Sequence, residues 1–177
     1  MGSAGLLAGM RVALLSCGPS VAKYEAQTKR YDVIIGVNRI VGKHYCDYWV
    51  FGDTETFLAV EPIGRPILVT DDATTYSLAH NYYVGLDEYQ QISWESLFNP
   101  LPLDTQLAFS ACAALLLVKH LRATSLDVFG VDMKGDAEWD GRTHPDRGED
   151  RWQRERLRWE YLIEWLRTGG ISAVFSK

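Results

Sequence analysis

The sequence predicts a single α/β domain of the Rossmann-like kind, with a mainly parallel sheet and helices on both faces. Short continuous apolar runs occur along the chain, which is typical of strands that are covered on both faces. These runs alternate with segments of helical periodicity, an order that favours parallel strands joined by crossover helices. The chain has no internal repeat, low-complexity tract or linker, so residues 1–177 are expected to form one domain, with residues 1–10 as an N-terminal extension.

The first half of the chain contains most of the predicted strands. Residues 11–16 (RVALLS) form the first one, which ends at the turn Gly18-Pro19-Ser20, where Ser20 is expected to cap a short helix. Four further runs are strand candidates: residues 32–37 (DVIIGV), 47–51 (DYWVF), 66–70 (PILVT) and, more weakly, 81–84 (NYYV). After the third strand, Asp53 or Thr54 is expected to cap another short helix.

The second half begins with a long predicted helix that starts at Asp104 or Thr105 and runs to Leu121. Apolar residues cover nearly its whole circumference, so we expect it to be buried on most sides and to pack against the sheet. Four segments follow: a strand over residues 125–131 (SLDVFGV), a polar loop or reduced lid over 132–150, a helix over 151–168 that ends at two glycines, and a last strand over 171–175.

Composition excludes several classes of protein. Eighteen Lys and Arg against 23 Asp and Glu give a net charge of −5, which argues against coating nucleic acid or an anionic membrane. The three cysteines, Cys17, Cys46 and Cys112, form no C-x-x-C pair, so they are expected to be free thiols in a reducing cytoplasm. No run approaches the ~20 apolar residues of a membrane span, and no signal-peptide pattern opens the chain. A soluble, cytoplasmic protein is therefore predicted.

Polar clusters directly follow the first two predicted strands, at the sheet edge where ligands bind in open parallel sheets. Gly18, Pro19 and Ser20 form a strand–turn–helix connection whose free backbone amides favour a phosphate, although the same residues also suit an ordinary turn. Asn38 and Arg39 offer amide and guanidinium donors to a phosphate, a ribose or a base. Alternatively, Asn38 makes a turn and Arg39 pairs with an acid.

Two more clusters follow later strands. Asp53 could hold a metal or a ribose hydroxyl, but we favour a helix cap. Gly130 and Asp132 end a strand, and His144 follows in the polar loop, where it is a candidate acid or base or else merely exposed. The chain has neither a pair of histidines at metal-binding spacing nor a G-x-S-x-G motif, which argues against a zinc hydrolase and an α/β-hydrolase.

The order of these motifs resembles the bacterial sialyltransferase family that includes the Campylobacter enzymes. The motifs are G-P-S after one strand, V-N-R after the next, D-Y-x-x-x-x-D, a serine-headed apolar helix (FSACA), a strand that ends G-V-D, and a histidine before the last helix. The sequence is also similar to 6-hydroxymethylpterin pyrophosphokinase-like proteins, which share the G-P-S opening. Short members of this broad group occur in bacteriophages.

The resemblance to sialyltransferases implies a cytidine monophosphate (CMP) site and a general base. The nucleotide-binding positions that it implies, with Arg39 added as their neighbour, are Gly18, Pro19, Ser20, Asn38, Arg39, Ser110, Gly130 and Asp132. The general base would be His144, and the reaction would need no metal. The sequence departs from the family at Ser16 and Val37, and its short segment 133–143 lacks the tyrosines of the family's lid.

Three hypotheses follow for the function. The first is a small metal-independent glycosyltransferase that uses a nucleotide-activated, CMP-type sugar and a possible glycan acceptor. The second is Mg²⁺-dependent diphosphate transfer from ATP, with Asp53, Asp132 and acids near Asp136 as ligands. The third is a non-catalytic nucleotide-binding module, such as a phage accessory protein. The sequence leaves the oligomeric state open.

Overall fold

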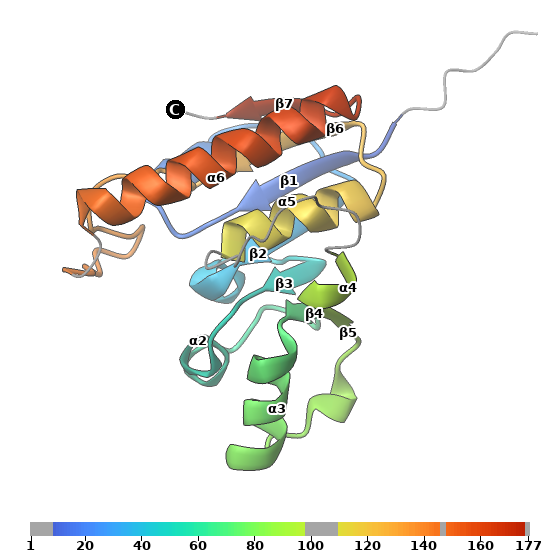
Figure 1. The fold of residues 1–177 in the computed structure, drawn as a ribbon, viewed down its shortest axis with the longest axis vertical. Helices are drawn as coiled ribbons and strands as arrows, with labels where there is room; N and C mark the ends of the chain where they lie inside the picture. The colour runs from blue at the N-terminus through green and yellow to red at the C-terminus, as the bar shows by residue number, and fades with distance from the viewer. Residues whose placement is uncertain (1–8, 98–109, 146–147, 176–177) are drawn as a thin grey trace, which may run out of the picture.

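The computed structural model describes residues 9–97, 110–145 and 148–175. Within these residues, seven strands form one sheet in the order β5-β4-β3-β2-β1-β6-β7 (Figure 1), and every adjacent pair is parallel. The strands are β1 (Arg11–Leu15), β2 (Val33–Val37), β3 (Tyr48–Val50), β4 (Ile67–Thr70), β5 (Gln91–Ser93), β6 (Ser125–Phe129) and β7 (Ser172–Phe175). The predicted α/β fold with a parallel sheet is confirmed.

Helices cover both faces of this sheet. The α-helices are α1 (Ala22–Glu25), α2 (Thr54–Ala59), α3 (Asp72–Asn81), α4 (Trp94–Leu97), α5 (Ser110–His120) and α6 (Glu149–Thr168). Three 3₁₀ turns are also present in the described residues: η1 (Pro19–Val21), η2 (Asn38–Gly42) and η3 (Leu86–Glu88). The alternation of side chains along β1 separates two cores. Val12 and Leu14 pack with residues of α4, α5 and α6, whereas Ala13 and Leu15 pack with residues of η1, η2 and α3.

Helix α5 is apolar all round because it lies in the middle of the larger core. Every residue from 111 to 118 is buried, and the helix contacts α4, α6, β2 and β3. Figure 1 shows α5 and α6 lying across the same face of the sheet. The prediction of a helix buried on most sides is confirmed over Ser110–His120, and its predicted start at Asp104 or Thr105 falls outside the described residues.

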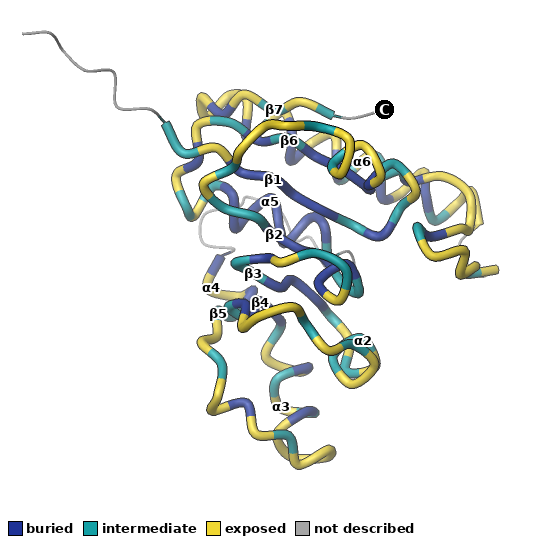
Figure 2. Tube along the Cα trace, turned by 180° about the vertical axis from the view of Figure 1, so that it is seen from behind, coloured by how far each residue is buried: buried dark blue, intermediate teal, exposed yellow. Residues whose placement is uncertain are grey.

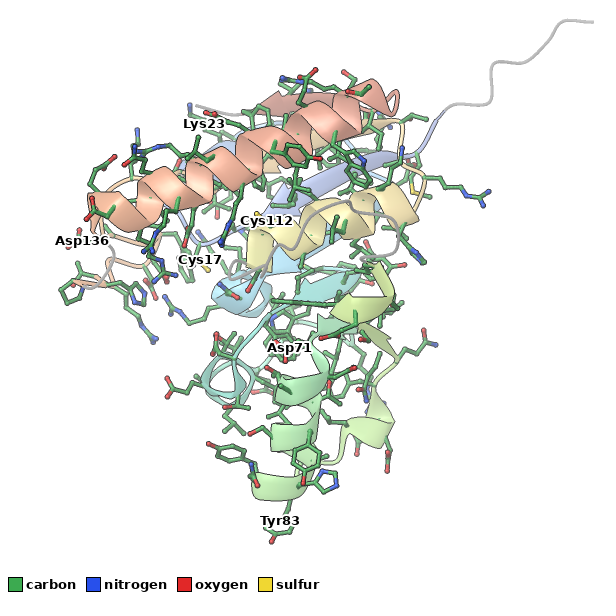
Figure 3. All side chains as sticks on the ribbon, in the orientation of Figure 1. Cys17, Lys23, Asp71, Tyr83, Cys112 and Asp136 are labelled. Atoms are coloured by element: carbon green, nitrogen blue, oxygen red, sulfur yellow. The ribbon has the colours of Figure 1, made fainter. Side chains whose placement is uncertain are left out.

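The prediction of a strand over residues 81–84 is wrong. Asn81 ends α3, and Tyr83 lies in a loop with a φ of +55° and 87% of its surface exposed. Figure 3 shows Tyr83 at the tip of the molecule beyond α3, and Figure 2 shows the largely exposed chain around it. The fifth strand of the sheet is instead β5. Helix α3 itself was not predicted, because only Thr74 and Leu78 are buried on it and they make no apolar stripe.

Two turns at the carboxyl edge of the sheet are bonded to each other, and we call them the paired turns: residues 16–20 after β1 and residues 130–132 after β6. The Gly18 amide donates to the Gly130 carbonyl at 2.8 Å, and the Gly130 amide donates to Ser20 Oγ at 3.0 Å. The Ser20 amide donates to Asp132 Oδ2 at 2.9 Å. Ser20 therefore bonds across the sheet edge instead of capping a helix as predicted.

Gly130 has no room for a side chain. Its φ is +75°, and an added Cβ would lie 2.1 Å from the Ser16 carbonyl oxygen. This conformation also explains why β6 ends at Phe129, before the predicted Val131. In the described part of the chain, no helix has the length and apolar character needed to cross a bilayer.

We expect Gly130→Ala to lower the free energy of unfolding by about 2–4 kcal/mol, because backbone strain and a clash with Ser16 add together. Gly135 is a matched control, since its φ is +65° and an added Cβ would meet nothing within 4 Å. Gly135→Ala should cost only about 1 kcal/mol. Urea unfolding of both variants tests the difference, and equal losses would contradict a special role for the paired turns.

Candidate functional site

A pocket of about 270 Å³ opens at the carboxyl edge of the sheet. It lies where the strand order reverses, because β1 pairs with β2 on one side and with β6 on the other. In open α/β sheets this crevice is the usual place for a ligand. Figure 1 shows the strand arrowheads pointing to this side, where η2 and the loop before α6 also lie.

Five of the predicted site residues line this pocket: Gly18, Asn38, Ser110, Gly130 and Asp132. They come from the ends of β1, β2 and β6 and from the first described turn of α5. Pro19, Ser20, Arg39 and His144 are not among the residues that line it. As predicted, the strand ends bring polar residues together at one edge of the sheet, although some of these residues lie more than 90 positions apart in the chain.

The paired turns do not offer the free amides that a phosphate site at Gly18-Pro19-Ser20 was expected to use. The amides of Gly18 and Ser20 donate to Gly130 and Asp132, and proline has no amide hydrogen. The helical segment formed by η1 and α1 is also too short to supply a strong dipole. Glycine is needed at position 18 for a steric reason, since an added Cβ would lie 2.3 Å from Asp132 Oδ2.

Asn38 presents an unused polar group to the pocket. Its φ is +56°, the left-handed conformation that asparagine tolerates better than most residues, and it begins η2 directly after β2. Its side-chain Oδ1 is buried and has no hydrogen-bond partner among the described residues. Buried polar atoms normally have partners, so this carboxamide is a strong candidate for contact with a ligand.

Arg39 turns away from the pocket and bonds to acids of the loop before α6. Its Nη1 donates to Asp140 Oδ2 at 2.9 Å, and its Nη2 pairs with the buried carboxylate of Glu138. Although burial opposes it, hydrogen bonds to Asp140 and Glu138 raise the pKa of Arg39 above its ordinary value. Of the two alternatives for Arg39, the structure therefore shows the one in which it pairs with an acid. Its donors are used by two acids, Asp140 and Glu138.

His144 reaches the pocket only through Glu138. Its Nε2 lies 2.8 Å from Glu138 Oε1, and its side chain is one third exposed. Glu138 lines the pocket and is almost fully buried, so the histidine sits behind this carboxylate. The loop is also held by Trp139, whose amide donates to the Cys17 carbonyl at 2.8 Å, and by the His144 amide, which donates to the Asp136 carbonyl.

Two strand-end aspartates that line the pocket are helix caps. Asp53 Oδ1 accepts from the Thr56 amide at 2.6 Å, which confirms the favoured interpretation, and Asp71 Oδ1 accepts from the Thr74 amide in the same way. Across the described ranges, no group of three or more His, Cys, Asp or Glu side chains is arranged to hold a metal ion. Asp136 lies on the loop beside the start of α6 (Figure 3) and not in the pocket lining.

The lining residues that were not predicted from the sequence include Lys134, from the segment after β6, and three residues of α6: Arg151, Trp152 and Glu155. Helix α6 extends past the sheet edge, so its first turns wall the pocket instead of covering strands (Figure 1). The sequence did contain a signal, because Glu155 falls among the mostly apolar positions that α6 buries: Trp152, Trp159, Leu162, Ile163 and Leu166. An acid on the buried face of a helix needs a structural or functional reason.

Comparison with known proteins shows a likeness in fold. No family model and no curated protein sequence matches the chain. The sialyltransferase CstII from Campylobacter jejuni, in complex with the substrate analogue CMP-3FNeuAc, is 11% identical, with a TM-score of 0.57 over 94% of this chain and 80% of that one. The same enzyme with cytidine-5′-monophosphate gives 11% identity and a TM-score of 0.54, over 94% and 79%. The protein therefore has a sialyltransferase-like fold.

The Arg39–Asp140 pair predicts a pH dependence of stability. The hydrogen bond from Arg39 lowers the pKa of Asp140 from 3.8 to about 2 in the folded protein. This contribution is complete above the unfolded pKa and is lost as the pH falls towards the folded value. We expect Asp140→Asn to cost less than about 1 kcal/mol at pH 7, because solvent screens the pair, and to cost progressively less between pH 4 and pH 2.

Urea unfolding of this variant at several pH values measures that change. Asp136→Asn removes an exposed carboxylate from the same loop and is the matched control. A cost of Asp140→Asn that stays constant from pH 7 to pH 2 would contradict the prediction.

Proposed function

We propose that the pocket binds the nucleotide of an activated sugar of the CMP type, and that the protein is a small glycosyltransferase of the sialyltransferase-like kind. One observation carries this proposal: the buried carboxamide of Asn38 lines the pocket at the end of β2 with its Oδ1 unpartnered among the described residues. Nucleotides offer hydroxyl and amine donors to such an acceptor. A ligand at Asn38 would also lie where the strand order reverses, next to Gly18 and Gly130.

The fold supports this choice of ligand. The two CstII structures of similar fold hold a CMP-sugar analogue and cytidine-5′-monophosphate. A volume of about 270 Å³ is near the lower end of pockets that bind small molecules. The sequence motifs that suggested a CMP site contribute five residues to the pocket lining, which is an independent reason to test cytidine nucleotides first.

We expect side chains to bind the phosphate, because the amides of Gly18 and Ser20 already donate to Gly130 and Asp132 and Pro19 has no amide hydrogen. Lys134 and Arg151 are the cationic residues of the lining, and Ser110 adds a hydroxyl. The carboxylates of Asp53, Asp71 and Asp132 suit ribose and sugar hydroxyls. Each of these carboxylates accepts one backbone hydrogen bond and keeps further lone pairs for a ligand.

His144 is the proposed general base. With Nε2 facing Glu138, Nδ1 is the nitrogen that carries the lone pair in the neutral ring. In the reaction, Nδ1 would take the proton of an acceptor hydroxyl while the oxygen of that hydroxyl bonds to the anomeric carbon of the donor sugar. The bond between that carbon and the phosphate oxygen breaks, and CMP leaves with the electron pair. The proposed reaction uses no metal ion.

Calorimetric titration with CMP in the presence of EDTA tests the nucleotide site. Asn38→Gly removes the carboxamide but keeps a residue that adopts positive φ, so we expect about tenfold weaker CMP binding with little loss of stability. Arg122→Gly is the matched control, since Arg122 is exposed and has a φ of +57°. Unaltered binding in Asn38→Gly, or binding of ATP with Mg²⁺ in preference to CMP, would overturn the proposal.

Release of CMP from CMP-sialic acid, with and without glycan acceptors, tests the enzyme. We expect His144→Ala to lower turnover by ~10²–10⁴ while CMP affinity stays nearly the same, because the base acts on the acceptor. His80→Ala, at the exposed end of α3, is the control. Full turnover in His144→Ala would exclude this histidine as the base. CMP binding without any release of CMP from the donor would identify a nucleotide-binding module instead of an enzyme.

A further inference from the structure

Glu155 is a buried carboxylate at the edge of the pocket. Its residue is 5% exposed, and it projects from α6 into the lining of the pocket. Arg151, one turn earlier, donates from Nε to Glu155 Oε1 at 2.7 Å. The second oxygen, Oε2, is buried and has no hydrogen-bond partner among the described residues. Arg151 uses Oε1, so Oε2 is the oxygen that could bind a ligand. As a carboxylate oxygen it would accept a hydrogen bond from a donor on that ligand.

The surroundings of Glu155 suit a flat, partly apolar group. Trp152 and Met133 are both buried and line the same pocket, and Trp152 lies three residues before Glu155 on the same side of α6. Across from α6, burial and then the charge of Glu155 raise the pKa of the Cys112 thiol to about 12. Aromatic and thioether surfaces beside one buried acceptor are typical of a slot for a heterocyclic ring.

A sugar or ribose hydroxyl does not need such a slot. The aspartates that line the pocket, Asp53, Asp71 and Asp132, are all less buried than Glu155 and can exchange hydrogen bonds with water. A buried acceptor without a partner among the described residues discriminates more strongly, because a ligand without the matching donor leaves it unsatisfied. The position of Glu155 therefore favours a role in selecting the base.

We propose that Glu155 Oε2 accepts a hydrogen bond from the exocyclic amine of cytosine and thereby selects cytidine over uridine nucleotides. This inference rests on the proposed nucleotide site. Cytosine carries an amine donor at the position where uracil carries a carbonyl acceptor, and Glu is a natural partner of that amine. A uracil in the same pose would turn the lone pairs of its O4 towards the carboxylate, so two acceptors would face each other without a hydrogen between them.

Titration calorimetry with CMP and UMP tests the inference. We expect the unaltered protein to bind CMP about tenfold or more tightly than UMP. In Glu155→Gln the side-chain amide can present either an acceptor or a donor, so the preference should fall below about threefold. Glu160→Gln removes the same charge from an exposed position of α6 and should leave the preference unchanged. A preference for CMP that survives in Glu155→Gln would overturn the role of Glu155.

A second probe avoids the mutation altogether. The CMP analogue with a 2-pyrimidinone base lacks only the exocyclic amine, so the unaltered protein should bind it about tenfold more weakly than CMP. Equal binding of CMP, UMP and this analogue would refute selection by the amine while leaving a nucleotide site in place. If none of the three binds, the proposed function itself fails.

Discussion

The hydrogen bonds between the paired turns are the interaction on which the site depends. Neither Gly18 nor Gly130 tolerates a side chain, because an added Cβ would clash with Asp132 in the first case and with Ser16 in the second, and Ser20 and Asp132 complete the contact. Because β1 is the strand at which the sheet order reverses, this contact fixes the floor of the crevice between the two halves of the sheet. It also uses the backbone amides of Gly18, Ser20 and Gly130, which are then not available to a ligand.

The walls of the pocket carry more acidic than basic side chains. Five carboxylates line it, from Asp53, Asp71, Asp132, Glu138 and Glu155, against the cations of Lys134 and Arg151. Glu138 is paired with Arg39, and Glu155 with Arg151, so both buried acids have a cation beside them. The three aspartates each accept a backbone amide, which stabilises their charge in place. A ligand rich in hydroxyl and amine donors fits this arrangement better than one with several anionic groups.

The sequence predicted the sheet well where burial alone decides the structure. Continuous apolar runs identified β1, β2, β3, β4, β6 and β7, because parallel strands covered on both faces need no polar alternation. The run at residues 81–84 was wrongly predicted to be a strand because it is rich in aromatic residues. Its tyrosines are exposed at the end of α3 and do not pack into a core. At the site, strand ends were predictable because topology brings them to one edge. Glu155 was not, since only the packing of α6 beyond the sheet brings it there.

The loop before α6 shows how a short segment can still complete one side of the pocket. Trp139 bonds to the Cys17 carbonyl, and Arg39 bonds to Glu138 and Asp140, so the loop is anchored to the ends of both β1 and β2. Arg39 thus acts through Glu138: it compensates the charge of a buried carboxylate whose other oxygen faces His144. The two polar residues of the V-N-R motif therefore have different roles. Asn38 faces the pocket, whereas Arg39 holds the acid that positions the histidine behind it.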